Sequence, residues 1–259
     1  MIEGPDARAF AHAQFSSKVT SLEAGGWQFS AWLGPQGRVR AFFHLIRLAK
    51  DTYLLLLRGG TAASMAEALQ PFVFRSKVSI SAQLPRNLSA GAALPTHAVL
   101  TEDDVICLGC DTYSMQIAES IVDDDNTWLA PQLRLGWPWL PESALDELLP
   151  AALSLQRLQA VAVDKGCYPG QEIVARLHFR GGHKRHLCSG TLSQPRNPGE
   201  ILRIEGNDVG RVLDVITEDA GNEALVVLND DVAIQAREEW LDLFDDKTVK
   251  MRITTSWPA

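Results

Sequence analysis

Cys167 is the residue with the clearest capacity for chemistry, because its thiol stands between two pairs that bend the chain. Lys165-Gly166 precedes it and Pro169-Gly170 follows it. Glycine and proline are strong punctuators of local structure, so the pattern predicts a thiol displayed at a bend rather than one held in a regular element. Thiolates react where they are exposed and close to positive charge. The segment therefore predicts a reactive cysteine.

Positive charge gathers around this thiol. Between residues 165 and 187 the only acid is Glu172, whereas five residues are basic: Lys165, Arg176, Arg180, Lys184 and Arg185. The whole chain has a formal net charge of -8, so the basic segment differs from the rest. A neighbouring cation, here Lys165, Arg176 or one of three histidines, lowers the pKa of a thiol. The same cations could bind the carboxylate tail of a ligand, meet a phosphate backbone or form a solvated face.

Two interpretations of Cys167 stay open at this point. Free cysteine is often a small buried hydrophobe rather than a nucleophile. If the thiol is reactive, it could contact a persulfide or a cluster, sense the redox state or attack a substrate, since all of these need an electropositive site.

The other cysteines carry weaker signals. Cys107-Leu108-Gly109-Cys110 has the spacing of a redox or metal pair, but no second pair completes a zinc site and the surrounding residues are typical of a buried strand. We expect these two thiols to pack in a core. Cys188 follows three histidines at spacings that match none of the usual closed zinc patterns, so no metal site is expected.

The eight positions from Lys165 to Glu172, Lys-Gly-Cys-Tyr-x-Gly-Gln-Glu, closely resemble the signature of the YgfZ family. These are folate-binding relatives of the glycine-cleavage T-protein, an aminomethyltransferase, and they are associated with iron–sulfur protein maintenance and with tRNA modification. The resemblance continues upstream at Trp128 and Gly136-Trp137-Pro138, and downstream at Arg180-Gly181-x-x-Lys184-Arg185. It covers the chain from about Phe10 into its C-terminal part.

The resemblance implies a pocket for a reduced folate, tetrahydrofolate or a related species. A carboxylate can accept bonds from the adjacent ring N–H and amino groups of a pterin, so Glu172 is expected to hold that ring. Trp128 is expected to stack on an aromatic ring of the ligand. The alternatives are a surface glutamate and a tryptophan that fills the core. The expected cofactor-binding set is Trp128, Lys165, Tyr168, Gln171, Glu172, Arg176, Arg180 and Arg185, with Cys167 as the reactive group.

One departure from the T-protein pattern bears on catalysis. The T-protein relatives carry a Thr-Asn-Asp-Val-like segment whose aspartate serves catalysis near the folate nitrogen. The corresponding stretch here is 14–19, with Lys18 where the acid would stand. A lysine cannot supply the carboxylate that holds or deprotonates an amine. We therefore expect an accessory factor rather than an aminomethyltransferase, and the change also bears on whether folate binds at all.

The elements that would position these residues begin with an α+β pattern. Residues 38–48 and 53–58 are typical of a β-hairpin. Ser64-x-x-Glu67 has the form of a capping box and predicts the start of a helix. Residues 78–81 alternate as a half-buried strand does, and 99–110 predict a strand pair. Helices on one face of an antiparallel sheet would follow from this order.

The sequence pattern of the C-terminal part is typical of an all-β domain. Residues 143–149 predict a short helix before the basic segment. After it, the apolar stretches Val209–Val215, Ala224–Leu228 and Val249–Ile253 predict the walls of a small β-barrel. We place a domain boundary near Cys188, with residues 1–187 as a T-protein-like folate-binding region of two α+β lobes and 188–259 as the barrel. The resemblance implies three lobes, of which the first two are intertwined.

Composition predicts a cytoplasmic protein. The 259 residues are 46% hydrophobic and 22% charged, which is ordinary for a globular chain. No apolar run approaches the roughly 18 residues of a membrane span. The stretch 1–6 lacks the basic and then apolar pattern of a signal peptide. Four cysteines in this length do not indicate a secreted disulfide scaffold.

Three functions follow for testing. The leading hypothesis is a tetrahydrofolate-binding accessory protein that supports iron–sulfur cluster assembly or repair in client proteins, such as tRNA-thiolating enzymes, with Cys167 as the reactive group. The first alternative is a folate-dependent one-carbon (aminomethyl) transferase. The second is an RNA-binding adaptor that uses residues 176–185, through which tRNA itself would be a partner.

Overall fold

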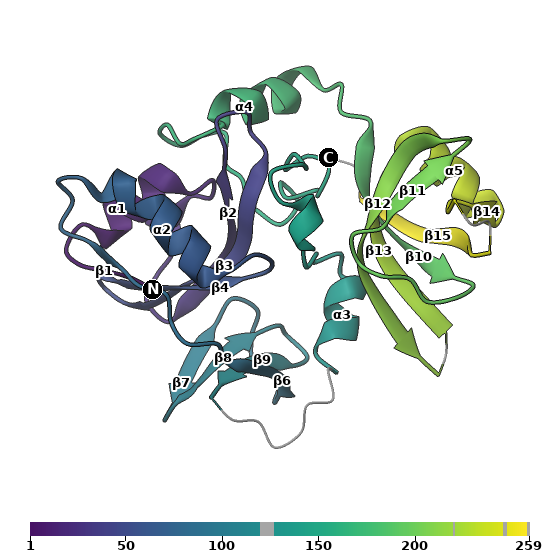
Figure 1. Cartoon of the computed structure of the whole chain (residues 1–259). Helices are drawn as coiled ribbons and strands as arrows, with labels where there is room; N and C mark the ends of the chain where they lie inside the picture. Colours follow the sequence, from purple (N-terminus) through teal and green to yellow (C-terminus); the bar gives the residue numbers. More distant parts are fainter. Residues whose placement is uncertain (120–126, 220, 246–247, 258–259) are drawn as a thin grey trace. The chain divides into compact units, whose positions relative to one another are not determined.

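The computed structural model describes residues 1–119, 127–219, 221–245 and 248–257 (Figure 1). Its chain divides into two compact units. The first unit comprises Met1–Leu33, Ala41–Pro131 and Gln159–Pro169. The second comprises Gly34–Arg40, Gln132–Leu158 and Gly170–Ala259. Each unit is therefore assembled from three stretches of sequence. The domain boundary predicted near residue 188 stays a prediction.

A five-stranded sheet with the order β2-β3-β4-β1-β5 is the base of the first unit. Its strands are β1 (Ile2–Glu3), β2 (Gly26–Leu33), β3 (Val39–Ala49), β4 (Thr52–Leu57) and β5 (Ser79–Ile80). β3 and β4 are antiparallel neighbours, so the predicted hairpin is confirmed. Most of β3 is buried on both faces, and its interior positions are mainly apolar, although His44 and Arg47 are buried among them.

Helices α1 (Ala7–Gln14) and α2 (Ala62–Val73) cover one face of this sheet. Phe10 of α1 and Leu69 of α2 belong to one buried cluster with Phe43 of β3. The predicted start of α2 was wrong: the side chain of Thr61 accepts a 3.2 Å bond from the amide of Ser64, so the helix begins at Ala62 and Ser64 lies in its first turn.

A four-stranded antiparallel sheet completes the first unit. Its order is β6-β9-β8-β7, with β6 (Asn87–Gly91), β7 (Val99–Glu102), β8 (Val105–Gly109) and β9 (Ser114–Ala118). β7 and β8 confirm the strand pair predicted across 99–110. The indole N–H of Trp27 on β2 donates a 3.1 Å bond to the carbonyl of Gly109, which ties this sheet to the larger one.

The C-terminal part of the second unit is a nearly closed barrel with the order β11-β12-β13-β10-β15-β14. The strands are β10 (Arg185–Leu192), β11 (Ile201–Ile204), β12 (Asn207–Glu218), β13 (Gly221–Asn229), β14 (Leu241–Asp242) and β15 (Lys250–Trp257). The amide of Arg203 donates a 2.8 Å bond to the carbonyl of Leu243, which links the two edges of the sheet. The three predicted strand stretches are confirmed as β12, β13 and β15.

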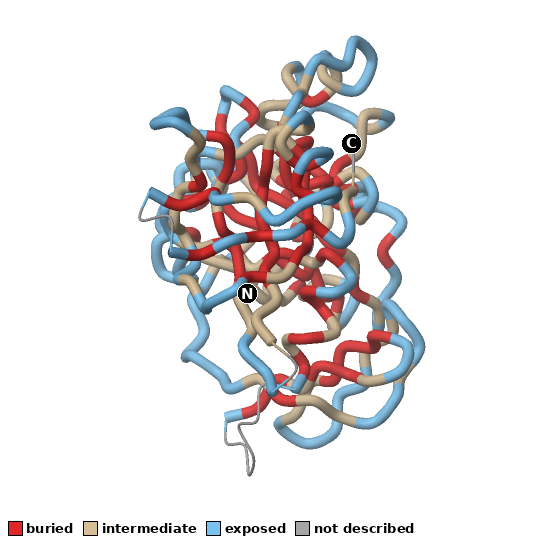
Figure 2. The backbone as a smooth tube through the Cα atoms, turned by 90° about the vertical axis from the view of Figure 1, so that its right-hand side faces the viewer, coloured by how far each residue is buried: buried red, intermediate tan, exposed pale blue. Residues whose placement is uncertain are grey.

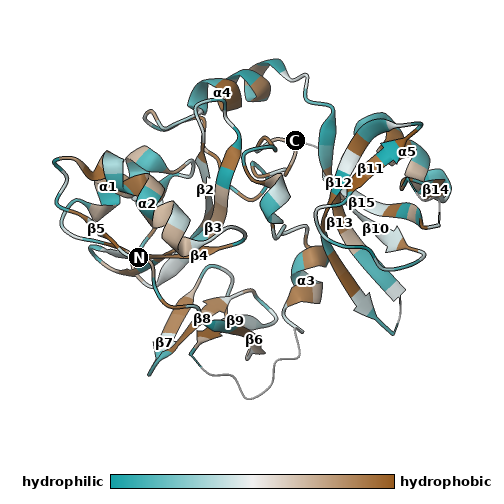
Figure 3. Ribbon diagram, viewed as in Figure 1, coloured by the Kyte–Doolittle hydropathy of each residue, from teal (hydrophilic) through white to brown (hydrophobic). Residues whose placement is uncertain are grey.

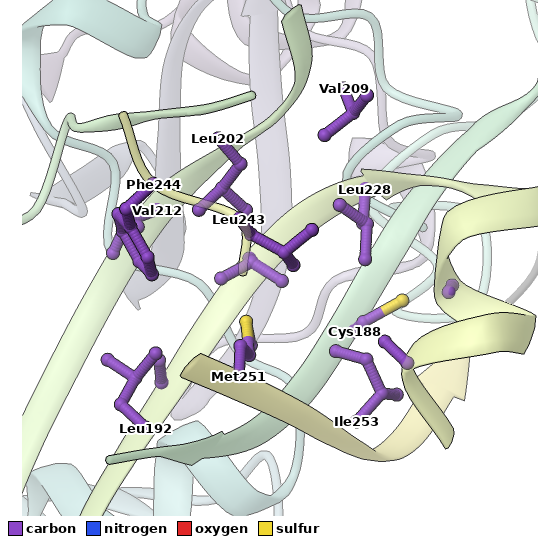
Figure 4. Close-up of a cluster of buried hydrophobic side chains, with 14 of the residues drawn as sticks. Cys188, Leu192, Leu202, Val209, Val212, Leu228, Leu243, Phe244, Met251 and Ile253 are labelled. Carbon is purple, nitrogen blue, oxygen red and sulfur yellow. The ribbon is translucent and has the colours of Figure 1, made fainter. Parts of the chain in front are cut away.

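Buried apolar side chains fill the barrel. Val212, Leu228 and Ile253 come from three different strands and meet in one cluster (Figure 4). The middle of β13 is apolar (Figure 3) and buried. Figure 2 marks the buried stretches of the described chain in red. Helix α5 (Asp230–Glu238), which the sequence patterns did not predict, adds Ala233 and Ala236 to this core.

The remaining elements of the described chain are short helices. They are η1 (Val19–Ser21), α3 (Leu129–Arg134), η2 (Glu142–Ala144) and α4 (Gln171–Arg180). The helix predicted over 143–149 was wrong beyond the 3-10 turn of η2. The amide of Asp146 donates to the carbonyl of Val39, and the amide of Val39 donates to that of Leu148, each at 2.8 Å, so this stretch pairs with the start of β3 instead.

The predicted α+β class, with a C-terminal barrel-like sheet, is therefore confirmed. Among the described residues, no helix is both long enough and apolar enough to span a bilayer.

Candidate functional site

Cys167 is exposed, while the other three cysteines, all free, are buried. It lies among bends just before α4, so the predicted exposure of the thiol is confirmed. The predicted packing of Cys107 and Cys110 in a core is also confirmed, and burial raises the pKa of both thiols. Burial raises the pKa of Cys188 in the barrel to about 11. The reactivity of Cys167 stays a prediction.

Lys165 fastens the cysteine turn to the end of α1. Its ammonium donates to the carbonyl of His12 at 2.5 Å, to that of Phe15 at 2.5 Å and to that of Ser17 at 2.9 Å. The last carbonyls of a helix lack partners within it, and a lysine has three donors. Because all three donors are used here, Lys165 holds the turn in place. Burial lowers the pKa of its ammonium to about 8.

Tyr168 forms the other side of the same clamp. Its ring is buried and lies 4.9 Å from the ammonium of Lys165, and its hydroxyl donates a 2.8 Å bond to the carbonyl of Ala162. Burial raises the pKa of this phenol. The hydroxyl of Ser16 donates to the carbonyl of Ala160 at 2.6 Å and extends the attachment of this stretch. Lys165 and Tyr168 therefore flank Cys167 with their polar atoms already occupied.

Lys18, the residue at the expected position of the T-protein acid, forms an ion pair with Asp164. The ammonium and carboxylate are 3.0 Å apart and both side chains are more than half exposed. Lys18 lowers the pKa of the Asp164 carboxyl. Nearby, the pKa of His12 is lowered by partial burial and by adjacent positive charges, that of Lys165 first. The surroundings of the cysteine turn are therefore electropositive.

The chain passes from Cys167 into α4 through a close backbone crossing. Gly170 has a left-handed φ of 76°, and a Cβ there would lie 2.7 Å from the carbonyl oxygen of Gly34. Gly37 has φ 74°, and a Cβ on it would come within 2.8 Å of the Ile173 side chain. Only glycine fits both positions without strain. This packing within the second unit fixes where α4 begins.

Helix α4 carries four of the predicted site residues. Val174 is buried and Gln171 is half-buried, whereas Glu172, Arg176 and Arg180 are exposed. These three recur every four residues and share one face of the helix. None of them has a salt bridge with another described residue. Glu172 also lies in the first turn, where the helix dipole favours its negative charge.

The remaining two predicted residues are engaged within their own units. Arg185 on β10 donates to the side-chain oxygen of Asn229 at 2.7 Å and to the carbonyl of Asp208 at 2.8 Å. Trp128, in the turn before α3, is only 8% exposed. The predicted site residues thus fall into two groups. Trp128, Lys165, Cys167 and Tyr168 belong to the first unit, and Gln171, Glu172, Arg176, Arg180 and Arg185 belong to the second.

The exposed groups have the chemistry that a folate requires. The carboxylate of Glu172 offers two acceptor oxygens to adjacent donors on a pterin. A guanidinium such as that of Arg176, one turn further along the helix, can pair with a carboxylate tail. The polar set on α4 could therefore hold the groups that the predicted folate would present, and its role as a folate site stays a prediction.

Phe179 is a residue that the sequence patterns missed. It lies in the last turn of α4 and is 74% exposed, although phenylalanine is usually buried. The sequence does contain a signal for it. If 171–180 forms a helix, Phe179 and Arg180 follow Arg176 by three and four residues and so lie on the same side of the helix as Arg176.

The fold is that of the aminomethyltransferase T proteins. The crystal structure of the glycine cleavage system aminomethyltransferase T from Bartonella henselae matches 99% of this chain and 82% of its own, with a TM-score of 0.68 and 18% sequence identity. At that identity the match establishes the fold alone. No protein-family model matches the chain.

The sequence comparisons are more specific than the structural match. The chain is 28% identical over 271 residues to the tRNA-modifying protein YgfZ of Klebsiella pneumoniae, covering 89% of this chain and 82% of that protein. It is 27% identical over 245 residues to the YgfZ protein of Edwardsiella ictaluri, covering 81% and 74%. An uncharacterised protein of Haemophilus influenzae is 26% identical over 244 residues. The chain is therefore a relative of the YgfZ proteins, and the predicted family resemblance is confirmed.

Proposed function

We propose that this protein is a folate-binding accessory factor in tRNA modification, in which Cys167 is the reactive thiol and a reduced folate is a ligand rather than a consumed substrate. The observation that carries the proposal is the exposed carboxylate of Glu172 in the first turn of α4, five residues after the exposed thiol. The similarity to tRNA-modifying proteins and the T-protein fold support the same conclusion.

Each group has a defined role in this proposal. Glu172 accepts the hydrogen bonds of the pterin, Gln171 assists it at the same helix end, and Arg176 pairs with the glutamate tail. The stacking role expected for Trp128 stays a prediction, because its side chain is 8% exposed within the first unit. Lys165 and Tyr168 act as positioning residues, because their polar atoms hold the turn that carries Cys167.

The thiol would serve iron–sulfur client proteins, including tRNA-thiolating enzymes. The thiolate is the form of cysteine that binds metal or attacks sulfur, and an exposed thiol is accessible to both kinds of partner. The exposure of Cys167 and the cations near His12 support this role.

A one-carbon transferase is the second candidate, because a carboxylate does lie beside Lys18. That carboxylate, of Asp164, is held in an ion pair and its pKa is lowered. A lower pKa makes it a weaker base, which disfavours proton abstraction from an amine. The accessory role is therefore preferred.

Calorimetric titration of tetrahydrofolate into the purified protein tests the proposal. We expect saturable binding that Glu172→Gln weakens at least tenfold. Glu238→Gln removes another exposed helical carboxylate, on α5, and should leave binding unchanged. Cys167→Ala should bind folate normally but fail to restore client activity in cells that lack the protein. A wild type that is folded but does not bind tetrahydrofolate would refute the folate assignment.

A further inference from the structure

The end of α4 carries an exposed aromatic ring among unpaired cations. Phe179 is 74% exposed, and Arg180 and Lys184, both exposed, follow it within five residues. Neither cation forms a salt bridge with a described residue. The cost of exposing a phenyl ring to water is offset when a planar partner covers it.

The surroundings of Phe179 indicate what kind of partner this is. The exposed residues that share its helix face are charged, namely Glu172, Arg176 and Arg180. The apolar residues of α4, such as Val174, face its own unit instead. The nearest ring is the imidazole of His178, with its centroid 4.8 Å from that of Phe179. A surface that docks another protein gathers several apolar residues, whereas one phenyl ring beside an imidazole and flanking cations matches a nucleobase with its phosphates.

The chain after α4 leaves room for such a ligand. Gly181 and Gly182 have φ values of 65° and 93°, and a Cβ on either would meet nothing within 4 Å. A hollow of about 560 Å³ follows, lined by Gly182, His183, Lys184, Arg185, Asn229, Asp230 and Asp231. The Nε2 atom of His183 is buried there and has no hydrogen-bond partner among the described residues.

The charges around the hollow favour a mixed polar ligand over a bare anion. Asp230 and Asp231 oppose Lys184 and Arg185, and the carboxylate of Asp230 already pairs with the imidazole of His186 at 2.5 Å. Donors and acceptors lie side by side in this lining. Ribose hydroxyls and base edges, which both donate and accept, suit such a surface.

We propose that the C-terminal end of α4 and the hollow beside it form a contact surface for single-stranded RNA, in which Phe179 stacks on an unpaired base while Arg180 and Lys184 meet phosphates. This assigns Arg180 to RNA rather than to the folate tail. The proposal rests on the tRNA-linked part of the proposed function and names its partner, but it does not need folate. A chain with a net charge of -8 repels RNA over most of its surface, so the contact is local.

Fluorescence anisotropy with a labelled single-stranded RNA dodecamer tests this surface on the full-length protein. Phe179→Ala should weaken binding about tenfold, because a stacked base contributes roughly that much. Arg180→Ala/Lys184→Ala should lower the slope of log affinity against log salt by about 1.4, at about 0.7 for each phosphate contact with a single strand. An RNA duplex of the same length should bind more weakly, since its bases are not available for stacking.

Matched controls lie in the first unit. Phe74 is 85% exposed and its ring lies 5.2 Å from the guanidinium of Arg75, so Phe74→Ala removes an equivalent ring, and Arg75→Ala/Lys77→Ala removes the same charge. These controls should bind RNA as the wild type does. The proposal would be overturned if the control variants lost as much RNA affinity as the α4 variants, or if the wild type showed no saturable RNA binding at low salt. A Phe179→Ala protein that binds RNA normally but loses its activity in cells would also overturn it, because α4 would then contact a protein. Tetrahydrofolate titration of Phe179→Ala separates this outcome from failure of the folate site.

Discussion

Replacing Lys165 by methionine tests the clamp that displays Cys167. The substitution keeps the length of the side chain and removes its three hydrogen bonds, to the carbonyls of His12, Phe15 and Ser17. At about 1 kcal/mol for each hydrogen bond, the variant should be about 3 kcal/mol less stable than the wild type at pH 7.

The stability difference should grow with pH, and its sign follows from the lowered pKa. The pKa of this ammonium is about 8 in the folded protein, against its ordinary value of 10.5. Between these values the unfolded chain binds a proton that the folded chain has released, so a rise in pH favours folding. At about 1.4 kcal/mol per pKa unit, the free energy of unfolding of the wild type should rise by about 2.5 kcal/mol relative to that of the variant between pH 7 and pH 10.

Urea unfolding of both proteins at pH 7 and pH 10 measures this difference. Titrations elsewhere in the chain affect both proteins alike and cancel in the comparison. Lys18→Met is the control, because the ammonium of Lys18 is exposed and solvent screens its ion pair with Asp164, so this substitution should change stability little. A stability difference that stays constant or narrows as the pH rises would contradict the lowered pKa of Lys165, whereas a variant as stable as the wild type at pH 7 would refute the clamp.

Further predictions concern the same turn. Tyr168→Phe should lower the free energy of unfolding by about 1 kcal/mol, measured in urea, because the carbonyl of Ala162 loses its donor. Gly170→Ala should lower the free energy of unfolding by about 2 kcal/mol or more, because the left-handed φ strains an alanine and its Cβ would meet close contacts. Gly206→Ala has a similar φ but lies in open space, so it should lower the free energy of unfolding only by the strain of about 1 kcal/mol. Iodoacetamide at pH 7 should add one adduct to the native protein, at Cys167, and four in urea; a second native adduct in mass spectrometry would contradict the burial of the other thiols.

Local patterns predicted the parts of this fold that depend on neighbouring residues. The hairpin of β3 and β4 follows from two apolar runs with a short polar link, and the exposure of Cys167 follows from the bends that flank it. The start of α2 was misplaced because Thr61, rather than Ser64, satisfies the free amides of the first turn. Either hydroxyl could have done so, and only the path of the chain before the helix decides between them.

Contacts across long stretches of sequence could not be predicted in this way. Lys165 was expected to act on the thiol, yet its donors reach three carbonyls that lie 148 to 153 residues earlier in the chain. Nothing in the residues around Lys165 indicates which carbonyls lack partners elsewhere. The same applies to Arg185, whose partners, Asn229 and Asp208, are set by the register of the barrel. Phe179 was missed for a simpler reason, since 171–180 was not taken as a helix.

The interleaving of the two units has a consequence for how the protein is made. The first unit includes Gln159–Pro169, so a ribosome must synthesise nearly two thirds of the chain before that unit can close. Until Lys165 emerges from the ribosome, the carbonyls at the end of α1 lack the donors that the native state gives them. The cysteine turn is thus the last part of the first unit to be synthesised, and a nascent chain can present its thiol only once that unit can be completed around it.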